Sequence, residues 1–196
     1  VQGIKYALLS SEYSDYQVSV TSKIVDTILI SFGIIDSKGF SVKILDALQE
    51  FGYRNKVIVA LGSKSLSTKL IKANIKKYTF NVDIVKDVDG LYNLMNKSDM
   101  VIGSGGVTLL ERMALGKPSI SIPVSSNQEQ QIELSGLMGA TFAVASDLHD
   151  INNGLEFILN NYKGREKMSR TARYLVDGNG AKRTASVITD TQINVW

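Results

Sequence analysis

The sequence contains no cysteine and one histidine among its 196 residues. Disulfide bonds, thiolate chemistry and cysteine-ligated zinc sites are therefore excluded, and one histidine excludes a multi-histidine metal centre. No apolar run is long enough to cross a membrane and no signal peptide is recognisable, so we expect no membrane insertion and a cytoplasmic location. Because the chain begins at Val1, in what reads as mid-sequence, we expect a fragment.

A large excess of charge of one sign is also missing. The chain has 22 basic and 19 acidic residues, which gives a formal net charge of +3. This modest excess fits a small anionic ligand. It does not indicate nucleic acid, because the lysines are scattered and no aromatic residues are interleaved with them. His149 has no nucleophile or carboxylate pattern around it and is interpreted as a surface residue. We predict no catalytic residue and no metal ligand in this chain.

Apolar runs alternate with amphipathic segments along most of the sequence. Strands are predicted at residues 23–31, 56–61, 80–85, 100–102, 119–124 and 141–145. Helices are predicted at residues 41–51, 65–76, 89–96, 107–115, from 127 onward, 147–160, 164–176 and 181 to the C-terminus. This alternation predicts an α/β fold: a Rossmann-like, doubly wound parallel sheet of about six strands, with trailing C-terminal helices. Residues 1–22 are predicted to be a connector or arm, and residues 23–196 the ligand-binding domain.

The strongest functional signal is a glycine cluster between a predicted strand and a predicted helix. Gly103, Gly105 and Gly106 allow a tight turn, and the helix that follows presents N–H groups and the positive end of its dipole, which suit a phosphate. The Thr108 hydroxyl can reach the same anion. Glu111, about one turn further, can accept hydrogen bonds from a ribose diol. The alternative is an ordinary strand-to-helix loop with Glu111 facing solvent, because short glycine patterns often occur by chance.

The longer string around this cluster is more specific. Gly103-Ser-Gly-Gly-Val-Thr-Leu-Leu-Glu111, followed by Leu115-Gly-Lys-Pro118 and Ile122-Pro-Val-Ser-Ser-Asn-Gln128, resembles the C-terminal half of GT-B glycosyltransferases related to MurG. Within that group it is most similar to the PseG family. Those UDP-sugar hydrolases remove UDP from a 2,4-diacetamido-trideoxyhexose in pseudaminic acid biosynthesis.

The resemblance implies a UDP or UDP-sugar ligand, and neither a cofactor nor a metal. It also implies a missing N-terminal Rossmann-like half, which in the family carries the histidine that activates water. We therefore expect this chain alone to bind UDP weakly and to be catalytically inactive.

The loops after Ser31, Leu61, Val85, Ile102 and Ile122 would supply the implied nucleotide site. The glycine cluster and the loop after the first strand would approach the diphosphate, and the turn near Val88 would hold the uracil ring by its backbone. Asn127 and Gln128 would face the sugar or its phosphate, although Asn127 also suits a helix N-cap. The implied binding residues are Gly33, Val88, Gly103, Ser104, Gly105, Gly106, Val107, Thr108, Glu111, Asn127 and Gln128.

Two positions depart from the family pattern. Ile34 stands where the family has the second glycine of a Gly-Gly-x-Asp loop, and Ser10 stands where an arginine follows Tyr-Ala-Leu-Leu. Three hypotheses therefore stay open. The chain is half of a UDP-sugar hydrolase, half of an inverting GT-B glycosyltransferase that uses a UDP-sugar, or a degenerate, non-catalytic nucleotide-sugar-binding or interaction domain. Ile34 and Ser10 favour the third hypothesis, and the intact string from Gly103 to Glu111 opposes it.

Overall fold

A single parallel sheet organises the chain. The structure, a computed structural model, describes residues 2–15, 21–145 and 147–193. Six strands pair in the order β3-β2-β1-β4-β5-β6, and every neighbouring pair is parallel. The strands are β1 (Thr27–Ser31), β2 (Lys56–Leu61), β3 (Asn81–Lys86), β4 (Met100–Gly103), β5 (Ser119–Ser121) and β6 (Phe142–Ala143). The predicted Rossmann-like doubly wound fold is confirmed, and the strand order reverses between β1 and β4, where such folds bind ligands.

The central strands are apolar because both of their faces are covered. Ile28, Leu29 and Ile30 of β1 are fully buried. Ile28 and Ile30 belong to the hydrophobic core on one face of the sheet, whereas Leu29 belongs to the core on the other face. This alternation follows from the two-residue period of a strand, and burial on both faces accounts for the continuous apolar runs.

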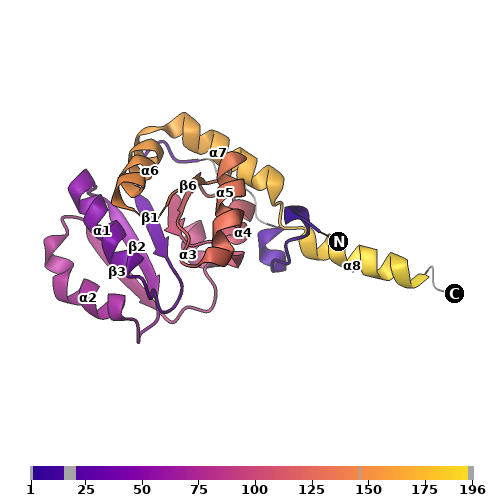
Figure 1. Ribbon diagram of the computed structural model, residues 1–196, viewed down its shortest axis with the longest axis horizontal. Coiled ribbons are helices and arrows are strands. Elements are labelled where there is room, and N and C mark those ends of the chain that lie inside the picture. The colour runs from indigo at the N-terminus through magenta and orange to yellow at the C-terminus, as the bar shows by residue number, and fades with distance from the viewer. Residues whose placement is uncertain (1, 16–20, 146, 194–196) are drawn as a thin grey trace.

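Helices cover each face of the sheet (Figure 1). The core on one face contains buried residues of α1, α2 and α6, and the core on the other contains residues of α3, α4 and α5, while α7 contributes to both. The helices are α1 (Phe40–Phe51), α2 (Leu66–Asn74), α3 (Tyr92–Asn96), α4 (Val107–Ala114), α5 (Glu129–Leu137), α6 (Leu148–Asn160), α7 (Tyr162–Leu175) and α8 (Gly180–Ile193). None of the helices that the structure describes is both long and apolar enough to span a bilayer.

Some predicted boundaries are wrong for identifiable reasons. The helix α1 begins at Phe40, one residue before its predicted start, and its N-cap residue, Gly39, has no side chain to accept a hydrogen bond. Instead, the Asp36 carboxylate accepts hydrogen bonds from the N–H groups of Phe40 (2.9 Å) and Ser41 (3.0 Å). The strand β5 ends before residue 124, because Pro123 cannot donate to the ladder.

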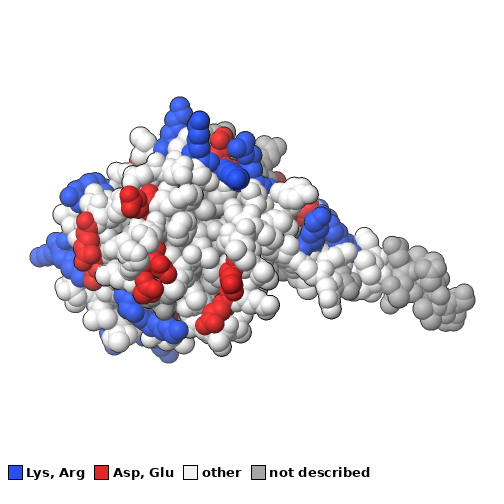
Figure 2. Space-filling view, turned by 45° about the horizontal axis from the view of Figure 1, so that its top comes forward, with Lys and Arg blue, Asp and Glu red and all other residues white. Residues whose placement is uncertain are grey.

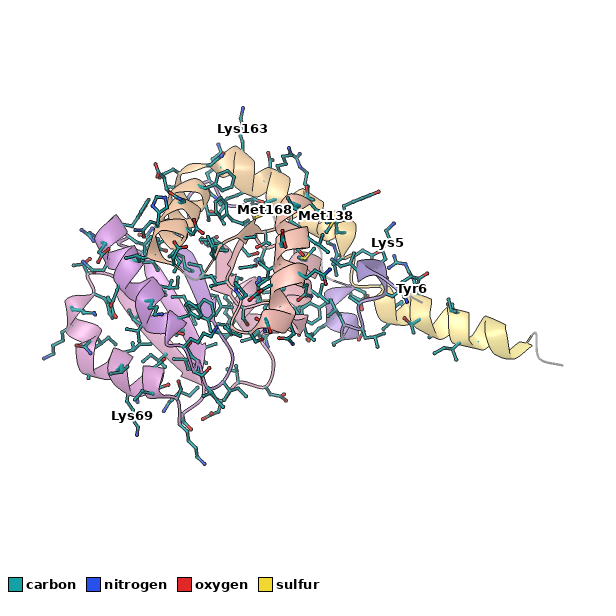
Figure 3. All side chains as sticks on the ribbon, viewed as in Figure 1. Lys5, Tyr6, Lys69, Met138, Lys163 and Met168 are labelled. Atoms are coloured by element: carbon teal, nitrogen blue, oxygen red, sulfur yellow. The ribbon has the colours of Figure 1, made fainter. Side chains whose placement is uncertain are left out.

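The N-terminal residues pack beside the last helix. The short helix η1 (Ile4–Tyr6) contacts α8, and Arg183 of α8 donates to the Lys5 carbonyl at 2.9 Å. Figure 1 shows α8 projecting from the body of the domain at the end where η1 lies, and Figure 3 shows Lys5 and Tyr6 next to it. A second short helix, η2 (Ser11–Tyr13), places Tyr13 in the core beneath α4.

Candidate functional site

The glycine turn connects β4 to α4 at the carboxyl edge of the sheet. Gly103 ends β4 in register with Ser31 of β1 and Ser121 of β5, and a Cβ on Gly103 would lie 2.5 Å from the Ser31 carbonyl oxygen. Gly106 has φ 78° and ψ −152°, a conformation that is essentially reserved for glycine. The glycines at these two positions are therefore required by strand packing and by the backbone of the turn.

Two glutamine side chains accept hydrogen bonds from N–H groups of this turn. The Gly105 N–H donates to Gln128 Oε1 at 3.2 Å, and the Gly106 N–H donates to Gln131 Oε1 at 2.7 Å. Gln128 Oε1 also accepts from the Val124 N–H at 3.1 Å. In this conformation the N–H groups of Gly105 and Gly106 therefore already have acceptors and are not free for a diphosphate. A bound anion must either displace the glutamine oxygens or use N–H groups at the start of α4, where the Leu109 N–H already donates to the Gly106 carbonyl at 3.2 Å.

Three of the predicted binding residues line one pocket. A cavity of about 160 Å³ at the carboxyl edge is bordered by Gly33, Val88 and Thr108, together with Ile34 and Leu91 among others. The loop after β3 is shaped by Asp87, which has φ 51° and whose carboxylate accepts from the Ser63 N–H at 2.9 Å. The structure thus brings together residues from the loops after β1 and β3 and from the first turn of α4, which are far apart in the sequence.

Glu111 lies one turn further along α4 and does not line this pocket. Its carboxyl group is partly buried, and burial raises its pKa above the usual value. A hydrogen bond with the Tyr13 hydroxyl and the charge of Arg112 act in the opposite direction and favour the ionised form. Tyr13 packs edge-on against Tyr92, with ring centroids 5.3 Å apart. Glu111 therefore points towards the N-terminal segment rather than towards bulk solvent, and its role in ribose binding stays a prediction.

The remaining predicted residues differ in exposure. Ser104 is buried, and Val107 is 60% exposed. Asn127 is exposed within η4 (Ser126–Gln128), and its side chain does not cap α5, because Gln128 holds the N-cap position. The suggestion that Asn127 is an N-cap is therefore wrong, because a short 3-10 helix separates it from α5.

Gln131 was not among the predicted site residues, although it contacts the turn directly. It follows Gln128 by three residues, so both side chains emerge from the same side of the chain as it enters α5. That spacing is the sequence signal that pairs it with Gln128. Its contact with Gly106 spans 25 residues and is not visible in the sequence.

Arg112 is the second residue that the sequence interpretation missed. Its side chain is 1% exposed. Its Nη2 donates to the Ser104 carbonyl and to Ser121 Oγ, both at 2.7 Å. The Ser121 hydroxyl lies 2.6 Å from Thr141 Oγ1, which extends the polar network under the sheet edge. Burial lowers the pKa of Arg112 to about 9, so the side chain stays positively charged at neutral pH.

Charged side chains are dispersed over the face of the molecule that Figure 2 shows. Figure 2 shows lysine and arginine side chains in several separate groups on the visible face, with acidic side chains between them. Lys69 and Lys163, at opposite ends of the domain, extend into solvent (Figure 3). Among the residues that the structure describes, no group of three or more His, Asp or Glu side chains is placed to hold a metal ion.

These features define an α/β domain with the fold of the C-terminal half of GT-B proteins, and with a glycine turn at its strand-order reversal. Residues 28–186 match the glycosyltransferase family 28 C-terminal domain, and the chain belongs to this family.

Known proteins similar to the chain are about twice its length. The spore coat polysaccharide biosynthesis protein SpsG of Bacillus subtilis (strain 168) is 24% identical over 204 residues, which cover 96% of this chain and 58% of that protein. The crystal structure of Acinetobacter baumannii MurG has a TM-score of 0.70 at 15% identity, over 97% of this chain and 55% of that one. The S. aureus MnaA–UDP co-structure has a TM-score of 0.70 at 13% identity, over 94% of this chain and 52% of that one. At these identities the two solved structures establish the fold alone.

Proposed function

We propose that this chain binds the UDP end of a UDP-sugar and is the nucleotide-binding half of a GT-B enzyme. The observation that carries the proposal is the convergence of Gly33, Val88 and Thr108 on one pocket beside the glycine turn. The family match supports it, as does the fold shared with MnaA, which has been solved with UDP. In this proposal Val88 holds the base, the first turn of α4 holds the diphosphate, and Glu111 meets the ribose.

The activity we favour is that of a UDP-sugar hydrolase of the PseG type, acting on a UDP-diacetamido-trideoxyhexose in bacterial surface-sugar (nonulosonate) biosynthesis. Its support is the motif resemblance between residues 103 and 128 and the name of the B. subtilis relative, a polysaccharide biosynthesis protein. Fixed N–H dipoles at the diphosphate would stabilise the UDP leaving group as its charge grows. The water-activating base would come from the N-terminal half.

The second candidate is an inverting GT-B glycosyltransferase, which the family description and the similarity to MurG favour. It differs only in that an acceptor hydroxyl replaces water, and the acceptor would bind the other half. Exposed apolar residues at the carboxyl edge support a second half packed across the site. Ile34 and Ile35, in the loop after β1, and Val107, at the start of α4, are 60–72% exposed there, and grouped exposed apolar residues often mark an interaction surface.

Calorimetry with UDP tests the binding proposal. We expect weak, saturable binding to this chain and no release of UDP from a UDP-sugar. The absence of heat at millimolar UDP would refute the nucleotide site. To separate the two activities, a protein carrying both halves is incubated with the UDP-sugar and no acceptor. Brisk release of UDP supports the hydrolase, whereas release that requires an added acceptor supports the transferase.

A further inference from the structure

A buried arginine lies directly behind the glycine turn. Arg112 Nη2 holds the Ser104 carbonyl at 2.7 Å, and Arg112 Nη1 lies 3.4 Å from the position that a Cβ on Gly103 would take. The guanidinium is therefore fixed against the backbone of residues 103–104. Because the Ser104 carbonyl is held towards the interior, the N–H of the same trans peptide unit, that of Gly105, faces the other way and meets Gln128. The next N–H, that of Gly106, meets Gln131.

The charge of this arginine is poorly balanced within the domain. In the described part of the chain, no carboxylate oxygen lies within salt-bridge distance of its nitrogens. Its neighbours are a carbonyl and a hydroxyl, and its Nε is buried with no hydrogen-bond partner. Glu111 acts on Arg112 only through its charge. A buried charge that lacks a hydrogen-bonded counter-ion is costly, and an anion bound at the turn would offset that cost.

We propose that Arg112 makes the glycine turn selective for phosphate charge, by fixing the Ser104 carbonyl and by supplying a buried positive charge that a bound diphosphate balances. The inference rests on the proposed UDP site and deepens it. Arg112 does not touch the ligand, because it is enclosed by the turn, and it is therefore a positioning residue. The specific consequence is that Arg112 favours UDP over uridine, which has the same base and sugar but no phosphate.

The test compares the affinity of UDP with that of uridine, by calorimetry, in the unaltered chain and in three variants. Arg112→Gln removes the charge but keeps an amide donor for the Ser104 carbonyl. We expect it to reduce the UDP-to-uridine affinity ratio by about tenfold while uridine affinity is unchanged, since the buried positive charge behind the turn is lost. Arg112→Lys keeps the charge and should retain a higher ratio than Arg112→Gln.

Arg165→Gln is the matched control, because Arg165 is the other fully buried arginine of the described chain. It holds backbone carbonyls, including those of Ser22 and Lys23 at 3.0 and 2.8 Å, far from the carboxyl edge of the sheet. We expect Arg165→Gln to lower the melting temperature without changing the affinity ratio. If Arg112→Gln does not fold, Arg112→Lys carries the test alone. The shorter lysine side chain places its charge farther from the Ser104 carbonyl, so we expect the UDP-to-uridine affinity ratio to fall about threefold.

The outcomes separate the inference from the proposed function. Equal weakening of UDP and uridine in the Arg112 variants, or an unaltered ratio, overturns the role of Arg112 and leaves the nucleotide site standing. If the unaltered chain binds neither UDP nor inorganic pyrophosphate, the proposed function is overturned, and the role of Arg112 falls with it. Binding of pyrophosphate without a preference for UDP over uridine also overturns the inference.

Discussion

Replacing Gln131 with methionine should make the free chain less stable and the UDP complex tighter. Gln131 Oε1 accepts the Gly106 N–H at 2.7 Å, and its Nε2 is 3.4 Å from the Gly106 carbonyl. Methionine has nearly the same length but offers no comparable acceptor. A diphosphate that uses the Gly106 N–H competes with this glutamine oxygen, so removing the oxygen removes the competitor.

The size of the effect follows from one partly exposed hydrogen bond. The net contribution of such a bond is about 0.5–1.5 kcal/mol. The free energy of unfolding of the free chain should therefore fall by about that amount, and UDP affinity should rise by about twofold to tenfold. Urea unfolding measures the first quantity and calorimetry the second. Gln130→Met is the control, because Gln130 is exposed in the same turn of α5 and should change neither.

Only one combination of results supports this reasoning. Lower stability with unchanged UDP affinity would mean that the ligand does not use the Gly106 N–H. Lower stability with weaker binding would mean that Gln131 itself contacts the ligand. Either result would refute the view that the glutamine and the diphosphate compete for the turn.

Three further predictions test the surroundings of the site. Tyr13→Phe should raise the pKa of Glu111 further, because the tyrosine hydrogen bond lowers it, and an NMR titration of the glutamate carboxyl groups that shows no upward shift would contradict this. Gly103→Ala should reduce the free energy of unfolding by about 1–3 kcal/mol, measured in urea, because its Cβ would lie 2.5 Å from the Ser31 carbonyl oxygen. Arg183 holds the pKa of Asp177 below its usual value of 3.8, so this pair stabilises the fold above about pH 3.8 and the contribution is lost as the pH falls. Asp177→Asn should therefore flatten that acid dependence and speed hydrogen exchange in α8, and unchanged exchange would argue against the pair holding α8.

The alternation of strands and helices could be predicted because the central strands are apolar throughout. Ile28 to Ile30 and Met100 to Ile102 each form short, continuous apolar runs, which is what burial on both faces of a parallel sheet requires. The ends of the elements were harder to predict. Asp36 stabilises the start of α1 from four residues before Phe40, and neither its left-handed backbone nor its contact is encoded in a local pattern.

The candidate site was predicted where its chemistry is local and missed where it depends on contacts between distant segments. The glycines and Thr108 form one contiguous string, so a motif identifies them. Arg112 directly follows this string, yet a charged residue in an amphipathic helix is expected to face solvent. Arg112 is buried beside Ser121, which lies at the end of β5. This contact can be recognised only when the pairing of β4 with β5 is known.

The geometry of Ile34 weakens the case for a degenerate domain. Ile34 stands where the family pattern has a glycine, and this departure favours a degenerate domain. The side chain is accommodated by Gly62 in the loop after β2, where a Cβ would lie 2.4 Å from Ile34 Cγ2, and the Gly62 N–H donates to the Ile34 carbonyl at 2.7 Å. The pocket beside it keeps about 160 Å³, and Ile34 stays 70% exposed along its wall. Ile34 packs against Gly62 and adds apolar surface to the rim of the pocket without closing it. This departure from the family pattern is therefore compatible with nucleotide binding.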